Sequence, residues 1–137
     1  MDALIRRVDT FDTDEYIDLL VRSTLAERRP VHDRGAIEGA LRGSDLCVEA
    51  RTEGTLVGAA RAVTDFHLAC YLADLAVDSA LHRSGVGLAL QRELRTHLGP
   101  HCKVKLSASP AASDYYPRIG YSPSTRAWQL NPGDTLG

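Results

Sequence analysis

Residues 82–90 read His-Arg-Ser-Gly-Val-Gly-Leu-Ala-Leu, between a strand pattern at 71–77 and a helical pattern that runs on to Leu98. Gly85 and Gly87 allow a tight turn at a helix start, where free N–H groups converge at the positive end of the helix dipole. This stretch therefore predicts an anion site, and a phosphate-bearing ligand is the first functional expectation. The alternative is a glycine turn that only joins strand to helix, because a short glycine motif is weak on its own.

Two better-known phosphate loops fit this stretch poorly. A P-loop needs Lys and then Ser or Thr after its last glycine, and here Leu88 and Ala89 follow. A dinucleotide fingerprint needs a small residue where Leu90 stands and an acid at the end of the next strand. That strand reads Val-Lys-Leu-Ser at 104–107 and offers no acid.

The composition is that of one ordinary soluble domain spanning residues 1–137. Hydrophobic residues make up 44% and charged residues 25% of the 137, and the net charge is −2. This near-neutral charge does not indicate a nucleic-acid or membrane partner. Neither a membrane span nor a signal peptide is apparent. Cys47, Cys70 and Cys102 are widely spaced beside apolar segments, so we expect reduced cysteines in a cytoplasmic protein.

The remaining patterns predict a mixed α/β chain. Asp12 and Glu15 indicate a helix start, and Phe11 and Tyr16 can form its hydrophobic staple. The expected inward residues of this helix are Ile17, Leu20, Val21 and Thr24, and it must stop around 28–30, where proline intervenes. Asp33 and Gly43 bound a second helix. Further helices are expected at 86–98 and 111–119, and strands at 4–8, 46–51, 55–63, 71–77, 102–107 and 125–130.

The order of elements and two motifs resemble the GCN5-related N-acetyltransferase (GNAT) superfamily. The family's coenzyme loop reads Gln or Arg, two free positions, Gly, one free position, then Gly or Ala. Here these positions are His82, Arg83, Ser84, Gly85, Val86 and Gly87. The second motif is an aromatic pair, three variable residues, then Gly and an aromatic, which here are Tyr115, Tyr116, Pro117–Ile119, Gly120 and Tyr121. The resemblance extends from Leu4 to Leu130.

The resemblance implies a mixed, mostly antiparallel central sheet of six to seven strands flanked by about four helices. It implies an N-acetyltransferase that moves an acetyl group from acetyl-CoA to a primary amine by direct attack in a ternary complex. Two other classes stay open: a non-catalytic acyl-CoA-binding regulatory or scaffold domain, and a protein-interaction domain whose glycines only turn the chain. Tyr116 counts against the non-catalytic binder, which would not need an acid.

The resemblance also assigns residues to the coenzyme. The backbone of the loop holds the pyrophosphate, and the strand before it bulges and splays so that pantetheine lies along its edge. The implied coenzyme-binding residues are Leu75, Ala76, Val77, His82, Arg83, Ser84, Gly85, Val86, Gly87, Leu88, Ala89, Ser109 and Tyr116. His82 replaces the usual Gln or Arg, Ser109 replaces a common Asn, and Pro117 removes a helix N–H.

Two residues carry the expected catalysis. Tyr116 is the general acid by position, because a phenol keeps its proton at neutral pH and can give it to the departing thiolate. Asp74 is the candidate general base, with its pKa raised by partial burial; the alternative is a structural pair with Arg61. His67 is the second candidate base, and Cys70 is a poor nucleophile. The histidines and cysteines show no metal-ligand spacing, so no metal is expected.

The acceptor is left open by the sequence. The acid-rich start of the first helix either complements its own dipole or favours a cationic amine. Arg28 and Arg29 instead favour an acceptor that also carries a carboxylate or phosphate. We expect a small-molecule amine or a peptide amine as acceptor, with no nucleic-acid or membrane partner. Family members are often homodimers, so a homodimer is a further expectation from the resemblance.

Overall fold

The computed structural model describes residues 2–137. The chain forms two compact units, the first ending at Ser107 and the second running from Ala108 to Gly137. We describe each unit by itself. Among the described residues, no helix is long and apolar enough to cross a membrane.

The first unit is built on a five-stranded sheet in the order β1-β2-β3-β4-β5. Its strands are β1 (Leu4–Val8), β2 (Leu46–Thr52), β3 (Thr55–Thr64), β4 (Ala69–Val77) and β5 (Lys103–Lys105). All neighbours pair antiparallel except β4 and β5, which are parallel. The mixed, mostly antiparallel sheet was expected, but the expected count of six to seven strands is wrong, because the described chain holds five.

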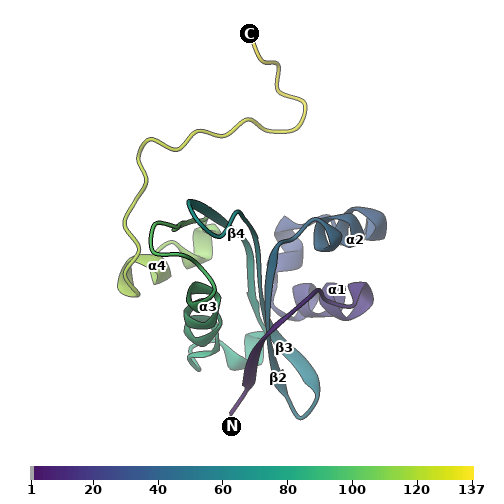
Figure 1. The fold of residues 1–137 in the computed structure, drawn as a ribbon. Helices are drawn as coiled ribbons and strands as arrows, with labels where there is room; N and C mark the ends of the chain where they lie inside the picture. Colours follow the sequence, from purple (N-terminus) through teal and green to yellow (C-terminus); the bar gives the residue numbers. More distant parts are fainter. Residues whose placement is uncertain (1) are drawn as a thin grey trace. The chain divides into compact units, whose positions relative to one another are not determined.

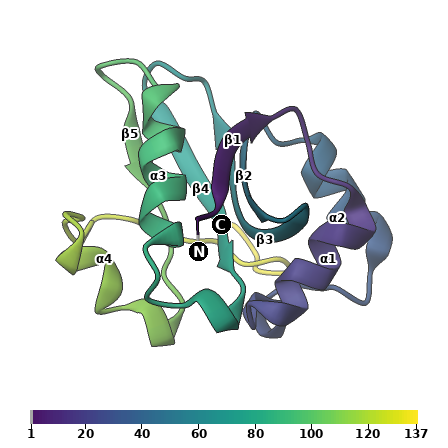
Figure 2. The same cartoon turned by 90° about the horizontal axis from the view of Figure 1, so that it is seen from below.

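Helices cover both faces of this sheet. α1 (Thr13–Arg22) and α2 (Arg34–Arg42) lie on one face and α3 (Val86–Thr96) lies on the other (Figures 1 and 2). The α1–α2 side buries a cluster that includes Tyr16, Leu20 and Ile37. The α3 side buries another that includes Leu90 and Leu94. The sheet therefore separates two apolar layers and contributes residues to both.

Asp12 and Asp33 start α1 and α2 as expected. The Asp12 side chain accepts from the Glu15 N–H at 3.0 Å, and the Asp33 side chain accepts from the Ala36 N–H at 3.0 Å. The expected end of the first helix is wrong. Thr24 adopts a left-handed backbone with φ 71°, which ends α1 after Arg22 and is followed by a 3-10 turn, η1 (Leu25–Arg28).

The buried stripe of α1 also differs from the expected one. Tyr16, Leu19 and Leu20 are buried, whereas Val21 is 57% exposed. Phe11 and Tyr16 do pack, with ring centroids 4.9 Å apart. Because Tyr16 points inward, the buried face of α1 is centred on Leu19. Val21 therefore lies on the exposed face of the helix.

A bulge in β4 determines on which face of the sheet the side chains of this strand lie. Arg61 pairs with Asp74 and Ala62 pairs with Leu72, so Ala73 has no partner in the β3–β4 register. Leu72 packs in the α3-side cluster, and Ala76 packs in the α1–α2-side cluster. An extra residue reverses the alternation, so the bulge turns Asp74 toward α1 and α2 instead of α3. The irregularity therefore lies at Ala73, just before Asp74.

The second unit is mostly irregular. It contains the 3-10 turn η3 (Pro110–Ala112) and α4 (Tyr115–Arg118), in place of one expected helix over 111–119. The strand expected at 125–130 is wrong: the described residues 122–137 form no strand. Trp128 in this segment is 95% exposed, so burial does not offset the entropy of ordering an isolated extended segment.

Candidate active site

We call residues 82–87 the glycine loop. Together with the 3-10 turn η2 (Ser79–Leu81), this loop joins β4 to α3. Gly85 adopts φ +91° as the N-cap of α3, a conformation that glycine adopts without a steric penalty. Arg83 is also left-handed, at φ 67°. Ala89 donates the first α-helical hydrogen bond, to Gly85 O at 3.0 Å. Two left-handed residues so close together make the chain turn sharply into the helix.

The start of α3 presents unpartnered donors. Over residues 2–137, no backbone or side-chain acceptor receives a hydrogen bond from the N–H of Gly85, Val86, Gly87 or Leu88. The first N–H groups of any helix lack intrahelical acceptors, and here no side chain caps them. These donors, with the positive end of an 11-residue helix, can hold an anion such as a pyrophosphate.

The loop is tied back to the strand that it follows. The His82 ring Nε2 lies 2.9 Å from Val77 O, and the Ser84 hydroxyl donates to Leu81 O. His82 thus supports the loop through the main chain at the end of β4.

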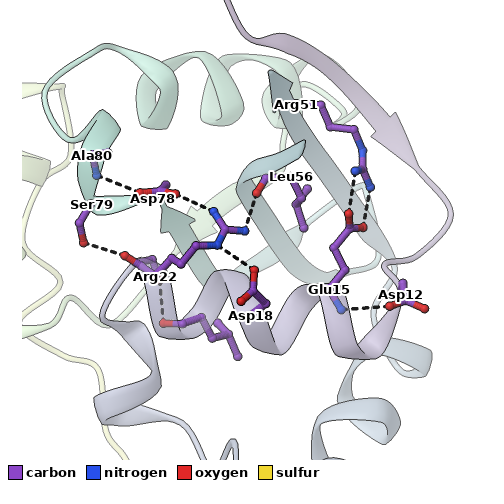
Figure 3. Close-up of polar contacts among 11 residues, drawn as sticks. Asp12, Glu15, Asp18, Arg22, Arg51, Leu56, Asp78, Ser79 and Ala80 are labelled. Carbon is purple, nitrogen blue, oxygen red and sulfur yellow. Dashed lines mark hydrogen bonds and ion pairs between the residues drawn. The ribbon is translucent and has the colours of Figure 1, made fainter. Parts of the chain in front are cut away.

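Arg22 joins this loop to α1 and β3 (Figure 3). Its guanidinium donates to Asp18 at 2.8 Å, to Asp78 at 2.6 Å and to Leu56 O at 2.7 Å. The Ser79 hydroxyl donates to Arg22 O at 2.7 Å. The N–H of Ala80 and the Arg22 guanidinium together lower the pKa of Asp78, which keeps this carboxylate ionised at neutral pH. The start of the loop is therefore anchored to the last turn of α1.

The edge of β4 next to the loop is open. β5 pairs with β4 only at Ala69–Tyr71, whereas β3 pairs with β4 as far as Val77. Within the described chain, Leu75, Ala76 and Val77 therefore lie beyond the end of the parallel ladder. An open strand edge is what an extended ligand needs for backbone pairing.

Asp74 lies in a buried charge cluster on the α1–α2 face. It is 3% exposed, and both of its carboxylate oxygens accept hydrogen bonds. Arg29 Nε donates to Oδ1 at 2.7 Å, and Arg61 Nε and the Tyr16 hydroxyl donate to Oδ2 at 2.7 and 2.6 Å. Arg29 Nη2 also donates to Ala73 O at 2.8 Å, at the bulge. The pairing with Arg61, which the sequence offered as the alternative role of Asp74, is present.

The expected rise in the pKa of Asp74 is wrong. Burial alone raises the pKa, but the hydrogen bond and charge of Arg61, with Tyr16 and Arg29, outweigh it and lower the pKa below the usual 3.8. Burial and the neighbouring carboxylate raise the pKa of Tyr16 well above its ordinary value, so its hydroxyl stays protonated and donates. The base role itself stays a prediction.

We expect Asp74→Asn to lower the free energy of unfolding by about 2–3 kcal/mol at pH 7, because the two guanidinium groups lose a buried counter-ion. Since the folded-state pKa is lowered, the ionised carboxylate stabilises the fold above pH 3.8 and loses this effect as pH falls through the folded-state value. Urea unfolding measures the free energy of unfolding of both proteins at pH 7 and pH 3. The difference between wild type and variant should be smaller at pH 3.

Asp14→Asn is the matched control, because Asp14 is exposed and also pairs with an arginine, Arg34. It should leave the free energy of unfolding unchanged. A difference for Asp74→Asn that is as large at pH 3 as at pH 7 would contradict the ionised counter-ion role.

The second unit carries the tyrosine motif. Tyr116 lies in α4 between Tyr115 and Tyr121, with ring centroids 5.0 and 5.3 Å away, both edge to face. Burial, together with these two rings, raises the pKa of Tyr116 to about 12. Its phenol is therefore protonated at neutral pH, as a general acid requires. Ser109 is half-buried and precedes η3, and its side chain caps no N–H there.

Other candidates lie away from this cluster. His67 is exposed in the turn before β4, and its N–H donates to Asp65 at 2.9 Å. It lies seven positions before Asp74 in the chain, which is roughly 20 Å in an extended strand. Burial raises the pKa of the Cys70 thiol, which suits its expected lack of reactivity. The structure thus brings Asp74 together with Arg29, Arg61 and Tyr16, but not with His67.

The sequence interpretation missed the roles of Arg22, Arg29 and Tyr16. The sequence did contain a signal that Asp74 needs a cationic partner and that Tyr16 needs a hydrogen-bond partner. Asp74 stands within the apolar run Leu72–Val77, and a carboxylate in a buried strand needs cationic partners from elsewhere in the chain. A buried tyrosine likewise needs a partner for its hydroxyl. Nothing local in the sequence indicates which arginine supplies each contact.

Comparison with known proteins gives a consistent result. The family model described as "Acetyltransferase (GNAT) domain" matches residues 18–131. No curated protein matches the chain. A GNAT-family acetyltransferase of Streptococcus pneumoniae superposes with a TM-score of 0.71 at 18% identity, covering 95% of this chain and 98% of that one. An acetyltransferase of Trypanosoma brucei gives 0.67 at 22% identity, covering 95% and 99%.

A third similar structure is an aminoglycoside acetyltransferase from an uncultured soil metagenomic sample, in complex with sisomicin. It superposes with a TM-score of 0.65 at 18% identity and covers 98% of this chain and 97% of that chain. At this identity the three structures support the fold, and the family model carries the assignment. Its match covers most of the chain, from α1 through the glycine loop and the tyrosine motif. The chain therefore belongs to the GNAT acetyltransferase family and is an acyltransferase.

Proposed function

We propose that this enzyme transfers an acetyl group from acetyl-CoA to a primary amine by direct attack in a ternary complex. One observation supports the proposal above the others: a short connection, residues 78–84, joins the open edge of β4 to the unpartnered N–H groups at the start of α3. A pyrophosphate on these N–H groups and an extended pantetheine arm on the open edge would place the thioester near Leu75–Val77. The whole of residues 1–137 then serves as one catalytic domain.

Each step has a residue for it. The N–H groups of Gly85–Leu88 hold the pyrophosphate, and a backbone N–H of Leu75–Val77 donates to the thioester oxygen. The amine nitrogen bonds to the carbonyl carbon, the carbon–sulfur bond breaks, and Tyr116 gives its proton to the departing thiolate. The proton lost by the amine goes to Asp74, directly or through water.

The lowered pKa of Asp74 makes it a weak base, so its role needs a kinetic readout of its own. If Asp74 takes the proton, kcat/KM of Asp74→Asn recovers at high pH, where the acceptor amine is already neutral. A loss that is equal at all pH values assigns Asp74 to positioning alone.

The proposal is tested by binding and turnover together. Acetyl-CoA at about 100 times its Kd should stabilise the fold by about 2.7 kcal/mol and raise the melting temperature by several degrees. Release of the coenzyme thiol is then measured over a panel of amino acids, polyamines, peptides and aminoglycosides. Sisomicin belongs in the panel because a structurally similar enzyme was solved in complex with it.

The outcomes separate the open classes. Stabilisation with thiol release supports the transferase. Stabilisation without release for any amine supports a non-catalytic acyl-CoA-binding domain. No stabilisation at all would leave the glycines as a turn.

A further inference from the structure

A cavity of about 170 Å³ lies between α1, α2 and the sheet, beside Asp74. Its apolar wall comes from both helices and includes Leu20, Ile37 and Leu41. Its polar wall is the cluster just described: Tyr16, Arg29, Arg61 and Asp74. Pockets for drug-sized ligands measure about 300–1,000 Å³, so this cavity fits only a small ligand.

The charges at the cavity do not balance. The charged residues that line it are Arg29, Arg61 and Asp74, two cations against one anion. Tyr16 stays neutral, because its pKa is raised. The side chains of Arg29 and Arg61 are only 28% and 12% exposed, so water screens the surplus positive charge poorly.

Both arginines keep donors to spare. The hydrogen bonds of Arg29 go to Asp74, Arg28 O and Ala73 O, one from each of its three nitrogens, while a guanidinium has about five N–H donors. Arg61 donates to Asp74 and to the Ser44 hydroxyl, and its side chain also interacts with the Tyr16 hydroxyl. A guanidinium is planar and can present two parallel N–H groups to a carboxylate. Asp74, by contrast, already accepts three hydrogen bonds from these partners.

We propose that this cavity binds the carboxylate of the acceptor, which makes the acceptor class a small amino acid with an apolar side chain. The inference rests on the proposed function and narrows its substrate. The carboxylate neutralises the surplus charge of Arg29 and Arg61, and the apolar side chain packs against Leu20, Ile37 and Leu41. A polycationic acceptor such as an aminoglycoside is disfavoured, because it brings further positive charge to this wall.

The test compares L-leucine with L-leucinamide, which has the same side chain and amine but no carboxylate. Calorimetry with and without coenzyme A measures binding, and no acetyl group is present to react. We expect leucine to bind roughly 10- to 100-fold more tightly than leucinamide, as charge-assisted hydrogen bonds imply. Equal binding of the two would overturn the inference.

Arg29→Gln removes one guanidinium and leaves Asp74 paired with Arg61 and Tyr16. Its preference for leucine should fall below about threefold. Arg28→Gln is the matched control: the same charge is lost one residue away, at an exposed side chain that does not line the cavity. It should keep the wild-type preference. An unchanged preference in Arg29→Gln would overturn the inference, and if that variant does not fold, wild-type calorimetry still decides.

Failure here can be told apart from failure of the proposed function. If acetyl-CoA neither binds nor yields free thiol with any amine, the proposed function fails, and leucine binding alone still tests the cavity. If thiol is released equally well with leucine and leucinamide, only the carboxylate assignment fails. Acetyl-CoA affinity should stay the same in both variants, because Gly85–Leu88 are unchanged.

Discussion

A Gly87→Glu protein is expected to fold normally and to lose about a thousandfold of its affinity for acetyl-CoA. Two like charges about 4 Å apart near a protein surface repel by about 4 kcal/mol, which corresponds to that factor. Gly87 lies in the first turn of α3, where the proposed pyrophosphate meets the N–H groups. An acid at this position suits the helix dipole, so helix formation does not suffer. Isothermal calorimetry gives the affinity and a circular dichroism melt gives the stability.

Gly39→Glu is the matched control for this change. Gly39 lies in α2, and a Cβ there would meet no atom within 4 Å. The same charge is added to a helix, away from the glycine loop, and coenzyme affinity should not change. A folded Gly87→Glu protein that binds acetyl-CoA as wild type does would remove the loop from the site.

Turnover of Tyr116→Phe should fall by about 10²- to 10⁴-fold, the usual contribution of a general acid, with coenzyme affinity unchanged. Because the pKa of Tyr116 is about 12, ionisation of this phenol should not limit wild-type turnover below about pH 11. Steady-state thiol release from pH 6 to 10, together with calorimetry, measures both effects.

Tyr115→Phe is the control, since this neighbouring ring belongs to the same motif and packs edge to face on Tyr116. It should retain turnover within about threefold. If Tyr116→Phe behaves like Tyr115→Phe, the thiolate leaves unaided or takes its proton from another group.

The elements of the first unit were largely predictable because their signals are local. Asp12 and Asp33 each cap a helix through an N–H three residues on, and Glu53–Gly54 turn a hairpin between adjacent strands. The helix break at Thr24 was not predictable, since nothing in a threonine specifies a left-handed backbone. The strand expected at 125–130 failed because a strand depends on a partner that local sequence does not reveal.

The candidate site was predictable only in part. The glycine loop and the tyrosine motif are contiguous, so a resemblance can locate them. The charge cluster is not contiguous: Tyr16, Arg29, Arg61 and Asp74 come from four elements or connections, separated by up to 58 positions. Its geometry depends on the bulge at Ala73, which determines on which face of the sheet the Asp74 side chain lies. No periodicity in Leu72–Val77 reveals that reversal, because every residue of this stretch except Asp74 is apolar.

The Arg22 contacts have a consequence for recombination between family members. α1 borders the cavity proposed for the acceptor, while its last residue bonds Asp78 and Leu56 O and receives the Ser79 hydroxyl (Figure 3). A chimera that imports α1 from a relative to change acceptor choice therefore separates Arg22 from the residues it bonds. The smallest exchangeable segment includes Asp78 and Ser79 as well, so we expect an exchange of α1 to disturb the glycine loop unless both segments are exchanged together.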